Sequence, residues 1–238
     1  MGNSSYIALS RQSGLFREMQ VVANNIANMS TTGYRKEGVV FSEFVQALDG
    51  RAPSVSMATG DVRTTIETQG ALSETGNRFD LAIEGPGYFL LDTPDGRALT
   101  RAGNFTPNAN GELVTPQGHR LLDAGAAPVF VPADARSVSI ASDGTLSVDG
   151  DPVAQLGLYK PANPADLLRS DGVMFMANGG VEPADGGSIV QGFLEESNVS
   201  PVAEIARMIE VQRAYELGQG LMEKEDSRIR RALETLGK

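Results

Sequence analysis

The chain has 238 residues, a net charge of −10 and a hydrophobic content of 41 %, which together allow one β domain with appended helices and argue against wholesale disorder. An acidic chain without a Lys/Arg block predicts no binding to nucleic acid, whose phosphates require a basic surface. Because cysteine is absent, disulfides, thiol nucleophiles and cysteine-ligated metal sites are excluded.

The start of the chain carries no recognisable targeting signal. Residues 1–6 lack the basic segment followed by an apolar one that is typical of a Sec signal. They also miss the myristoylation pattern, since Tyr6 stands where Ser or Thr is required. No stretch approaches the roughly 18–20 apolar residues that span a membrane. We therefore expect no membrane span, and export without a cleaved signal if the protein leaves the cytoplasm.

Glycine and proline divide the chain into three parts. Residues 50–192 hold 20 of the 27 glycines and 11 of the 12 prolines, whereas the two ends are almost free of both. Because these residues form turns and break helices, their distribution predicts a helix at each end and a long β-rich region between them. The predicted fold class is therefore α+β, with the N- and C-terminal helices paired as a coiled coil.

The N-terminal helix is predicted to begin with Asn3 or Ser4 as its cap and to end in the turn-forming residues 30–33. One stripe of this helix has the alternating steps of four and three that are typical of a coiled-coil seam. The stripe comprises Ala8, Gln12, Leu15, Met19, Val22, Ile26 and Met29.

Three asparagines near the end of this helix, Asn24, Asn25 and Asn28, oppose local helix propensity. Two interpretations remain open. The helix frays before the turn, or the amide side chains form hydrogen bonds to neighbouring helices or chains.

The middle of the chain contains six Asp-Gly or Asn-Gly pairs, which are hairpin turn signals. They lie at residues 95–96, 110–111, 143–144, 149–150, 171–172 and 178–179. Short apolar or alternating runs lie between them, as in a sandwich or a partly open barrel. We expect a mainly antiparallel β domain over residues 79–197. Residues 34–78, which are polar and Thr-rich, are predicted to form an extended β strap that joins it to the helix.

The C-terminal helix is predicted to begin with Ser200 as its cap and Pro201 at the first helical position. Apolar residues recur at intervals of seven, with partly polar companions between them. The apolar positions are Met208, Tyr215, Met222, Ile229 and Leu236, and the companions are Ile205, Gln212, Gln219, Asp226 and Leu233. Gln212 either sets the register between helices or is solvated on a surface.

Gly218 and Gly220 lie inside this second helix, where each costs about 1 kcal/mol relative to alanine. Either they kink the helix or they allow another backbone to approach closely, and we favour close approach.

The two terminal helices are predicted to form a discontinuous assembly domain of residues 1–33 and 198–238. A lone two-helix pair with such narrow apolar stripes is marginal in water, so neighbouring chains must complete the burial. The predicted assembly interface comprises Leu15, Met19, Val22, Asn24, Asn25, Ile26, Asn28, Met29, Ile205, Met208, Gln212, Tyr215, Gly218, Gly220, Met222, Ile229, Leu233 and Leu236.

Groups for catalysis or cofactor binding are scarce. His119 is the single histidine and lies in a turn, where a surface residue is expected. Residues 85–87 resemble a phosphate loop only in composition, because they precede a strand and Pro86 removes an amide. The Asp92/Asp95 pair is explained by a hairpin turn. We therefore expect no enzymatic activity, metal, cofactor or small-molecule substrate.

Ordered blocks of the sequence, spread over nearly the whole chain, resemble the flagellar axial proteins of the rod and hook. Residues 23–28 with 30–34 resemble the N-terminal signature of that family, and residues 196–199 with 208–216 its C-terminal signature. Residues 87–89, 99–106 and 110–118 resemble its central domain. The short length and residues 6–12 are most similar to proximal-rod members, with the distal-rod protein as the near alternative.

The resemblance implies a structural subunit whose terminal helices pack as a coiled-coil tube around an export channel, with β domains outside. It implies polymerisation with itself and other rod proteins across the periplasm, transmission of torque toward the hook, and export by the flagellar type III apparatus. Two alternatives from other classes remain: a secreted cell-wall-binding β module that its helices dimerise, and an enzyme of unrecognised type.

Overall fold

The computed structural model describes residues 3–46 and 55–236, and it describes side-chain burial for residues 8–40, 64–228, 230, 231 and 234. The chain divides into two compact units. The helical unit comprises Met1–Ala27, Lys36–Glu67 and Val199–Lys238, and the β unit comprises Asn28–Arg35 and Thr68–Asn198. Terminal helices that flank a mostly antiparallel β domain confirm the predicted α+β fold in outline.

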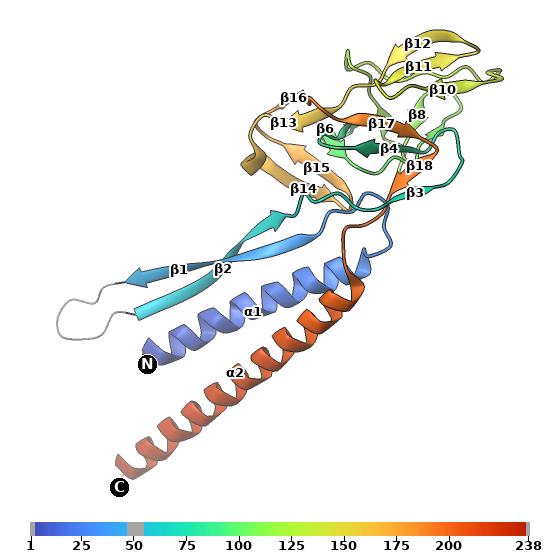
Figure 1. Cartoon of the computed structure of the whole chain (residues 1–238). Coiled ribbons are helices and arrows are strands. Elements are labelled where there is room, and N and C mark those ends of the chain that lie inside the picture. Colours follow the sequence, from blue (N-terminus) through green and yellow to red (C-terminus); the bar gives the residue numbers. More distant parts are fainter. Residues whose placement is uncertain (1–2, 47–54, 237–238) are drawn as a thin grey trace. The chain divides into compact units, whose positions relative to one another are not determined.

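The helical unit contains the helices α1 (Asn3–Ala27) and α2 (Pro201–Leu236) and a β hairpin (Figure 1). As predicted, α2 begins at Pro201, and the carbonyl of Ser200 accepts a hydrogen bond from Glu204 N–H at 3.0 Å. Among the described residues, neither helix is long and apolar enough to cross a membrane.

The first helix ends at Ala27, earlier than the sequence predicts. Asn28 and Thr31 close a turn at this point, because Thr31 N–H donates to Asn28 O at 3.1 Å and the two side chains also bond. Gly33 lies beyond the turn with a φ of +68°. A Cβ at this position would lie 2.3 Å from the backbone nitrogen of Ala102, so no larger residue fits without a shift of the backbone.

The hairpin of the helical unit consists of β1 (Glu37–Gln46) and β2 (Val55–Thr65), within the segment that the sequence assigns to a strap. The strands pair antiparallel, with Glu37 opposite Thr65 and an irregularity between Val40 and Phe41. This hairpin packs beside α1 (Figure 1).

The β unit contains many short strands. They are β3 (Leu72–Glu74), β4 (Leu81–Glu84), β5 (Phe89–Thr93), β6 (Gly96–Thr100), β7 (Thr106–Pro107), β8 (Leu113–Val114), β9 (Arg120–Leu121), β10 (Val138–Ile140), β11 (Thr145–Val148), β12 (Asp151–Gln155), β13 (Tyr159–Pro161), β14 (Leu167–Asp171), β15 (Met174–Ala177), β16 (Val181–Pro183), β17 (Ser188–Gln191) and β18 (Phe193–Glu195), with a 3₁₀ helix at Pro164–Asp166.

The largest sheet of the β unit has seven strands in the order β14-β15-β6-β5-β9-β8-β7. Strands β10, β11 and β12 form a second sheet, and β13-β16, β17-β4 and β18-β3 form separate pairs. Every strand pairing in the described part of the chain is antiparallel. No sheet among these strands closes into a barrel.

Five of the six predicted turns join strands that pair with each other. They are the turns at residues 95–96, 110–111, 143–144, 149–150 and 171–172. The turn at residues 178–179 differs, because it leads from β15 to β16, and β16 pairs with β13. A turn signal is local, whereas the choice of partner strand depends on the rest of the sheet.

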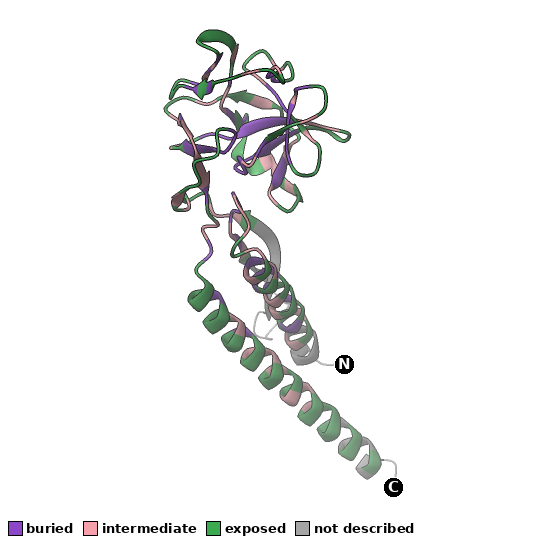
Figure 2. Ribbon diagram, turned by 90° about the vertical axis from the view of Figure 1, so that its right-hand side faces the viewer, coloured by how far each residue is buried: buried purple, intermediate pink, exposed green. Residues whose placement is uncertain are grey.

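Strand β5 is buried on both faces, which explains its continuous apolar sequence. Phe89 and Leu91 enter the larger core cluster, whereas Leu90 points into a second cluster with Phe175. The rings of Phe89 and Phe105 meet edge to face, with centroids 5.4 Å apart. Figure 2 shows this buried centre of the β unit in purple.

Candidate assembly surface

Within the helical unit, polar side chains link the two helices at more than one level. Gln12 Nε2 donates to the carbonyl of Tyr215 at 2.9 Å, and the ring of Tyr215 lies 6.4 Å from that of Phe16. Farther along α1, Glu18 Oε1 accepts a hydrogen bond from Arg207 Nε of α2 at 2.7 Å. This hydrogen bond raises the pKa of Arg207 above its ordinary value. The helices therefore contact each other through hydrogen bonds and ion pairs as well as apolar side chains.

Asn25 lies at the centre of a buried polar cluster and is only 1 % exposed. Its Nδ2 donates to the carbonyl of Glu37 at 2.9 Å and to Glu204 Oε2 at 3.1 Å. Its Oδ1 accepts from Glu37 N–H at 2.9 Å, and Lys36 Nζ pairs with the carboxylate of Glu204. One amide therefore joins the end of α1, the start of β1 and the first turn of α2. At Asn25 the structure favours hydrogen bonds to neighbouring elements over fraying.

The less exposed stripe of α2, here called its inward stripe, contains Met208, Tyr215 and Met222, but its other positions lie one residue before the predicted companions. Glu204 and Val211 are each 2 % exposed, whereas Ile205 is 50 % exposed and Gln212 is also exposed. Steps of four and three connect the inward residues, which are Glu204, Met208, Val211, Tyr215, Gly218 and Met222. The polar cluster at Asn25 accounts for this rotation, because it holds Glu204 inward.

The other predicted interface residues are distributed over several environments. Val22 and Asn25 are buried, Leu15, Met19, Asn24, Ile26 and Asn28 are half-buried, and Met29 is exposed. Asn28 and Met29 follow α1 and belong to the β unit. The side chains of Ile229, Leu233 and Leu236 lie outside the described ones. The assembly role of all these residues stays a prediction.

Glu204 and Lys36 were not among the predicted site residues. A signal for Glu204 was present, because it lies four residues before Met208 and seven before Val211 on one heptad stripe. No local pattern indicates that Lys36 pairs with it.

Exposed apolar side chains remain on both helices after the intrachain contacts are made. On α2, Val202, Ile205 and Ile209 share one outward face at steps of three and four, and Leu217 and Leu221 are exposed farther along. On α1, Leu9 and Phe16 are exposed. Figure 2 shows that α2 is exposed over most of its length. Apolar side chains exposed along one helix face are the kind of surface that protein partners cover.

Gly218 and Gly220 differ in their surroundings, and we expect alanine to affect them differently. A Cβ at Gly218 would lie 2.5 Å from Gln12 Oε1, whereas a Cβ at Gly220 would meet nothing within 4 Å. Gly220→Ala is expected to stabilise α2 by about 1 kcal/mol through helix propensity. Gly218→Ala is expected to give almost no gain. The new methyl group displaces the Gln12 side chain, and the loss of its hydrogen bond to Tyr215 offsets the gain in helix propensity.

Thermal unfolding of the helical circular dichroism signal measures both effects, with each glycine variant as the matched control for the other. Equal stabilisation by the two alanines would contradict the close approach of Gln12 to Gly218.

Comparison with known proteins matches three parts of the chain to flagellar families. Residues 6–35 match the family described as "Flagella basal body rod protein". Residues 82–148 match "Flagellar hook protein FlgE/F/G D1 domain", and residues 190–235 match "Flagellar basal body rod FlgEFG protein C-terminal". The chain belongs to the family of flagellar basal-body rod proteins, which confirms the resemblance seen in its sequence.

Among its relatives, proteins named FlgF are similar over the full length. The flagellar basal-body rod protein FlgF of Mesorhizobium japonicum is 40 % identical over 100 % of this chain and 99 % of its own. FlgF of Rhizobium meliloti is 37 % identical over the same shares. FlgG of Bacillus subtilis is 34 % identical over 95 % of this chain and 96 % of its own.

Proposed function

We propose that this protein is a structural subunit of the proximal rod of the bacterial flagellar basal body. The observation that carries the proposal is the apolar surface left exposed on α1 and α2 after their inner faces are occupied within the chain. Full-length similarity to proteins named FlgF supports the proximal rod in particular. The role is structural and non-enzymatic.

In this proposal the two helices pair as a coiled coil, and copies of the chain polymerise through them into a tube that transmits torque for motility. The assembly domain comprises residues 1–33 and 198–238, residues 34–78 form the strap, and residues 79–197 form the outer domain. The partners are further copies and other rod proteins. The subunit passes through the flagellar type III export apparatus without a cleaved signal and assembles in the periplasm.

The distal rod is the second candidate location. Similarity to FlgG of Bacillus subtilis over 95 % of this chain favours it, at a lower identity than that of the FlgF relatives. Electron microscopy of basal bodies whose subunits carry a tag near Asp185, an exposed loop residue, separates the two locations.

Removal of either terminal helix is expected to abolish incorporation into basal bodies and swimming. Chains that lack residues 1–27 or residues 201–238 keep the whole β unit, so its near-ultraviolet circular dichroism is expected to persist. The full-length chain with the Asp185 tag serves as the control and is expected to be incorporated. Normal incorporation of either shortened chain would contradict polymerisation through the helices.

A further inference from the structure

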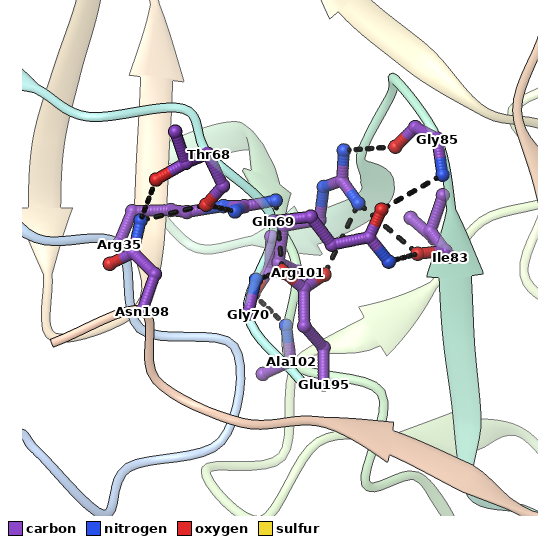
Figure 3. A network of polar contacts seen from close by, with 11 residues as sticks. Arg35, Thr68, Gln69, Gly70, Ile83, Gly85, Arg101, Ala102, Glu195 and Asn198 are labelled. Atoms are coloured by element: carbon purple, nitrogen blue, oxygen red, sulfur yellow. Dashed lines mark hydrogen bonds and ion pairs between the residues drawn. The ribbon is translucent and has the colours of Figure 1, made fainter. Parts of the chain in front are cut away.

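Glu195, the last residue of β18, lies between two buried guanidinium groups of the β unit (Figure 3). Its Oε1 is 3.0 Å from Arg35 Nη2 and its Oε2 is 3.2 Å from Arg101 Nη1. The side chains of Arg35 and Glu195 are 1 % exposed, and Arg101 is also buried. Burial and then the Arg35 charge lower the pKa of Arg101, whereas Glu195 acts to raise it. One carboxylate therefore balances two cations.

Glu195 also binds backbone groups of separate segments, through its carboxylate and through its backbone carbonyl, and further bonds join these segments. Glu195 Oε1 accepts from Gly70 N–H at 2.9 Å, and the carbonyl of Glu195 accepts from Gly33 N–H at 2.7 Å. Arg35 Nη1 and Asn198 Nδ2 both donate to the carbonyl of Thr68, the latter at 2.8 Å. Figure 3 shows Arg35 and Asn198 converging on Thr68.

These bonds join the segments that lead out of the β unit. The chain passes between the two units after Ala27, after Arg35, before Thr68 and after Asn198. The network ties together residues 33–35, 68–70 and 195–198, which adjoin the last three of these passages. We call these three segments the collar.

The collar is tightly packed as well as ion-paired. A Cβ at Gly70 would lie 2.0 Å from the carbonyl oxygen of Glu196, so these two backbones touch directly. The Asn198 N–H donates to the carbonyl of Tyr34 at 3.3 Å, which links the first and third segments once more. Little space is left for one segment to move without the others.

We propose that the collar is a positioning device, closed by Glu195, which holds the connecting segments at fixed spacing so that they carry load together. The inference rests on the proposed function as a rod subunit. A single extended connection bends at its own φ and ψ angles, whereas three segments joined by charge-assisted hydrogen bonds must move together. Buried ion pairs add little net stability over apolar side chains, so fixed geometry accounts for the triad better than stability does.

The variant Glu195→Gln tests the collar in the full chain. Glutamine keeps the size of the side chain but leaves two buried guanidinium groups without a counter-charge. Amide hydrogen exchange at Gly70 is expected to accelerate at least about tenfold, because its N–H donates to the carboxylate that loses its charge. Exchange at Gly33, whose N–H donates to the backbone carbonyl of Glu195, is expected to accelerate with it, because the segments of the collar move together. Exchange at Leu90, inside the paired strand β5, is expected to stay at the wild-type rate.

The matched control is Asp92→Asn, which makes the same chemical change at the exposed pair of Asp92 and Arg120. It is expected to leave exchange at Gly33 and Gly70 unchanged. If Glu195→Gln does not fold, Arg35→Met is used in its place. Glu195 and Arg101 then remain as a one-to-one ion pair without an unbalanced buried charge. Arg35→Met is expected to accelerate exchange at Gly70, and wild-type exchange there would overturn the proposal.

In cells, basal bodies built with Glu195→Gln are expected to contain the subunit, while swimming slows more than in the wild type as the medium is made more viscous. Incorporation with wild-type exchange and wild-type swimming under load would overturn the collar. Failure of the wild-type chain to enter basal bodies would instead contradict the proposed function. The exchange measurement on the isolated chain tests the collar whether or not the chain is incorporated.

Discussion

Replacement of Phe89 with alanine is expected to lower the free energy of unfolding of the β unit by about 3–5 kcal/mol. Phe89 is fully buried, and its ring packs edge to face on Phe105. Strand β5 is paired with β6 on one side and β9 on the other. Because both neighbours hold the backbone in place, the structure collapses little around the missing ring and the cavity persists.

Urea unfolding followed by near-ultraviolet circular dichroism measures this effect in the full chain. The matched control is Phe130→Ala, because Phe130 lies in the same unit but is 52 % exposed. Its loss is expected to cost about 1 kcal/mol or less. Equal unfolding midpoints for the two variants would contradict the central position of Phe89 in the core.

Replacement of Asn25 with alanine is expected to destabilise the helical unit by about 2–4 kcal/mol. The change removes the acceptor of Glu37 N–H and a donor to both Glu37 O and Glu204. The backbone of Glu37 is then left with unsatisfied buried groups at the start of β1. Alanine is a better helix former than asparagine, so α1 itself loses nothing through propensity.

The helical circular dichroism signal during heating measures the effect of Asn25→Ala. Gln20→Ala is the matched control, because Gln20 is an exposed amide on the same helix, and the change is expected to stay within about 0.5 kcal/mol. A melting curve for Asn25→Ala that overlays the control would show that this amide does not join the two helices.

Several features of the fold were predictable because their physical causes are local. Ser200 and Pro201 mark the start of α2, since a cap and a proline at the first helical position act within one turn. The Asp-Gly pairs place most hairpins correctly, because a glycine with positive φ shapes the turn where it stands. The run of asparagines left fraying and hydrogen bonding as alternatives, and the hydrogen bonds of Asn25 favour the second at that position.

The predicted site was less complete, and the missing part is long-range. Heptad spacing identified Met208 and Tyr215 on the inward stripe, but it placed Ile205 and Gln212 there in place of Glu204 and Val211. Two adjacent stripes of a helix have the same period, so periodicity alone does not choose between them. The choice depends on the contact of Glu204 with Asn25, which is distant in sequence.

The amino-acid sequence by itself determined the order helix, β region and helix, the start of the second helix, most of the turns and the membership of the rod family. Only the tertiary structure decided which face of α2 turns inward, which strands are neighbours, and that Glu195 is the shared partner of Arg35 and Arg101. The reason is physical: capping, turns and periodicity act over a few residues, whereas ion pairs and strand neighbours form only when distant segments of the folded chain meet.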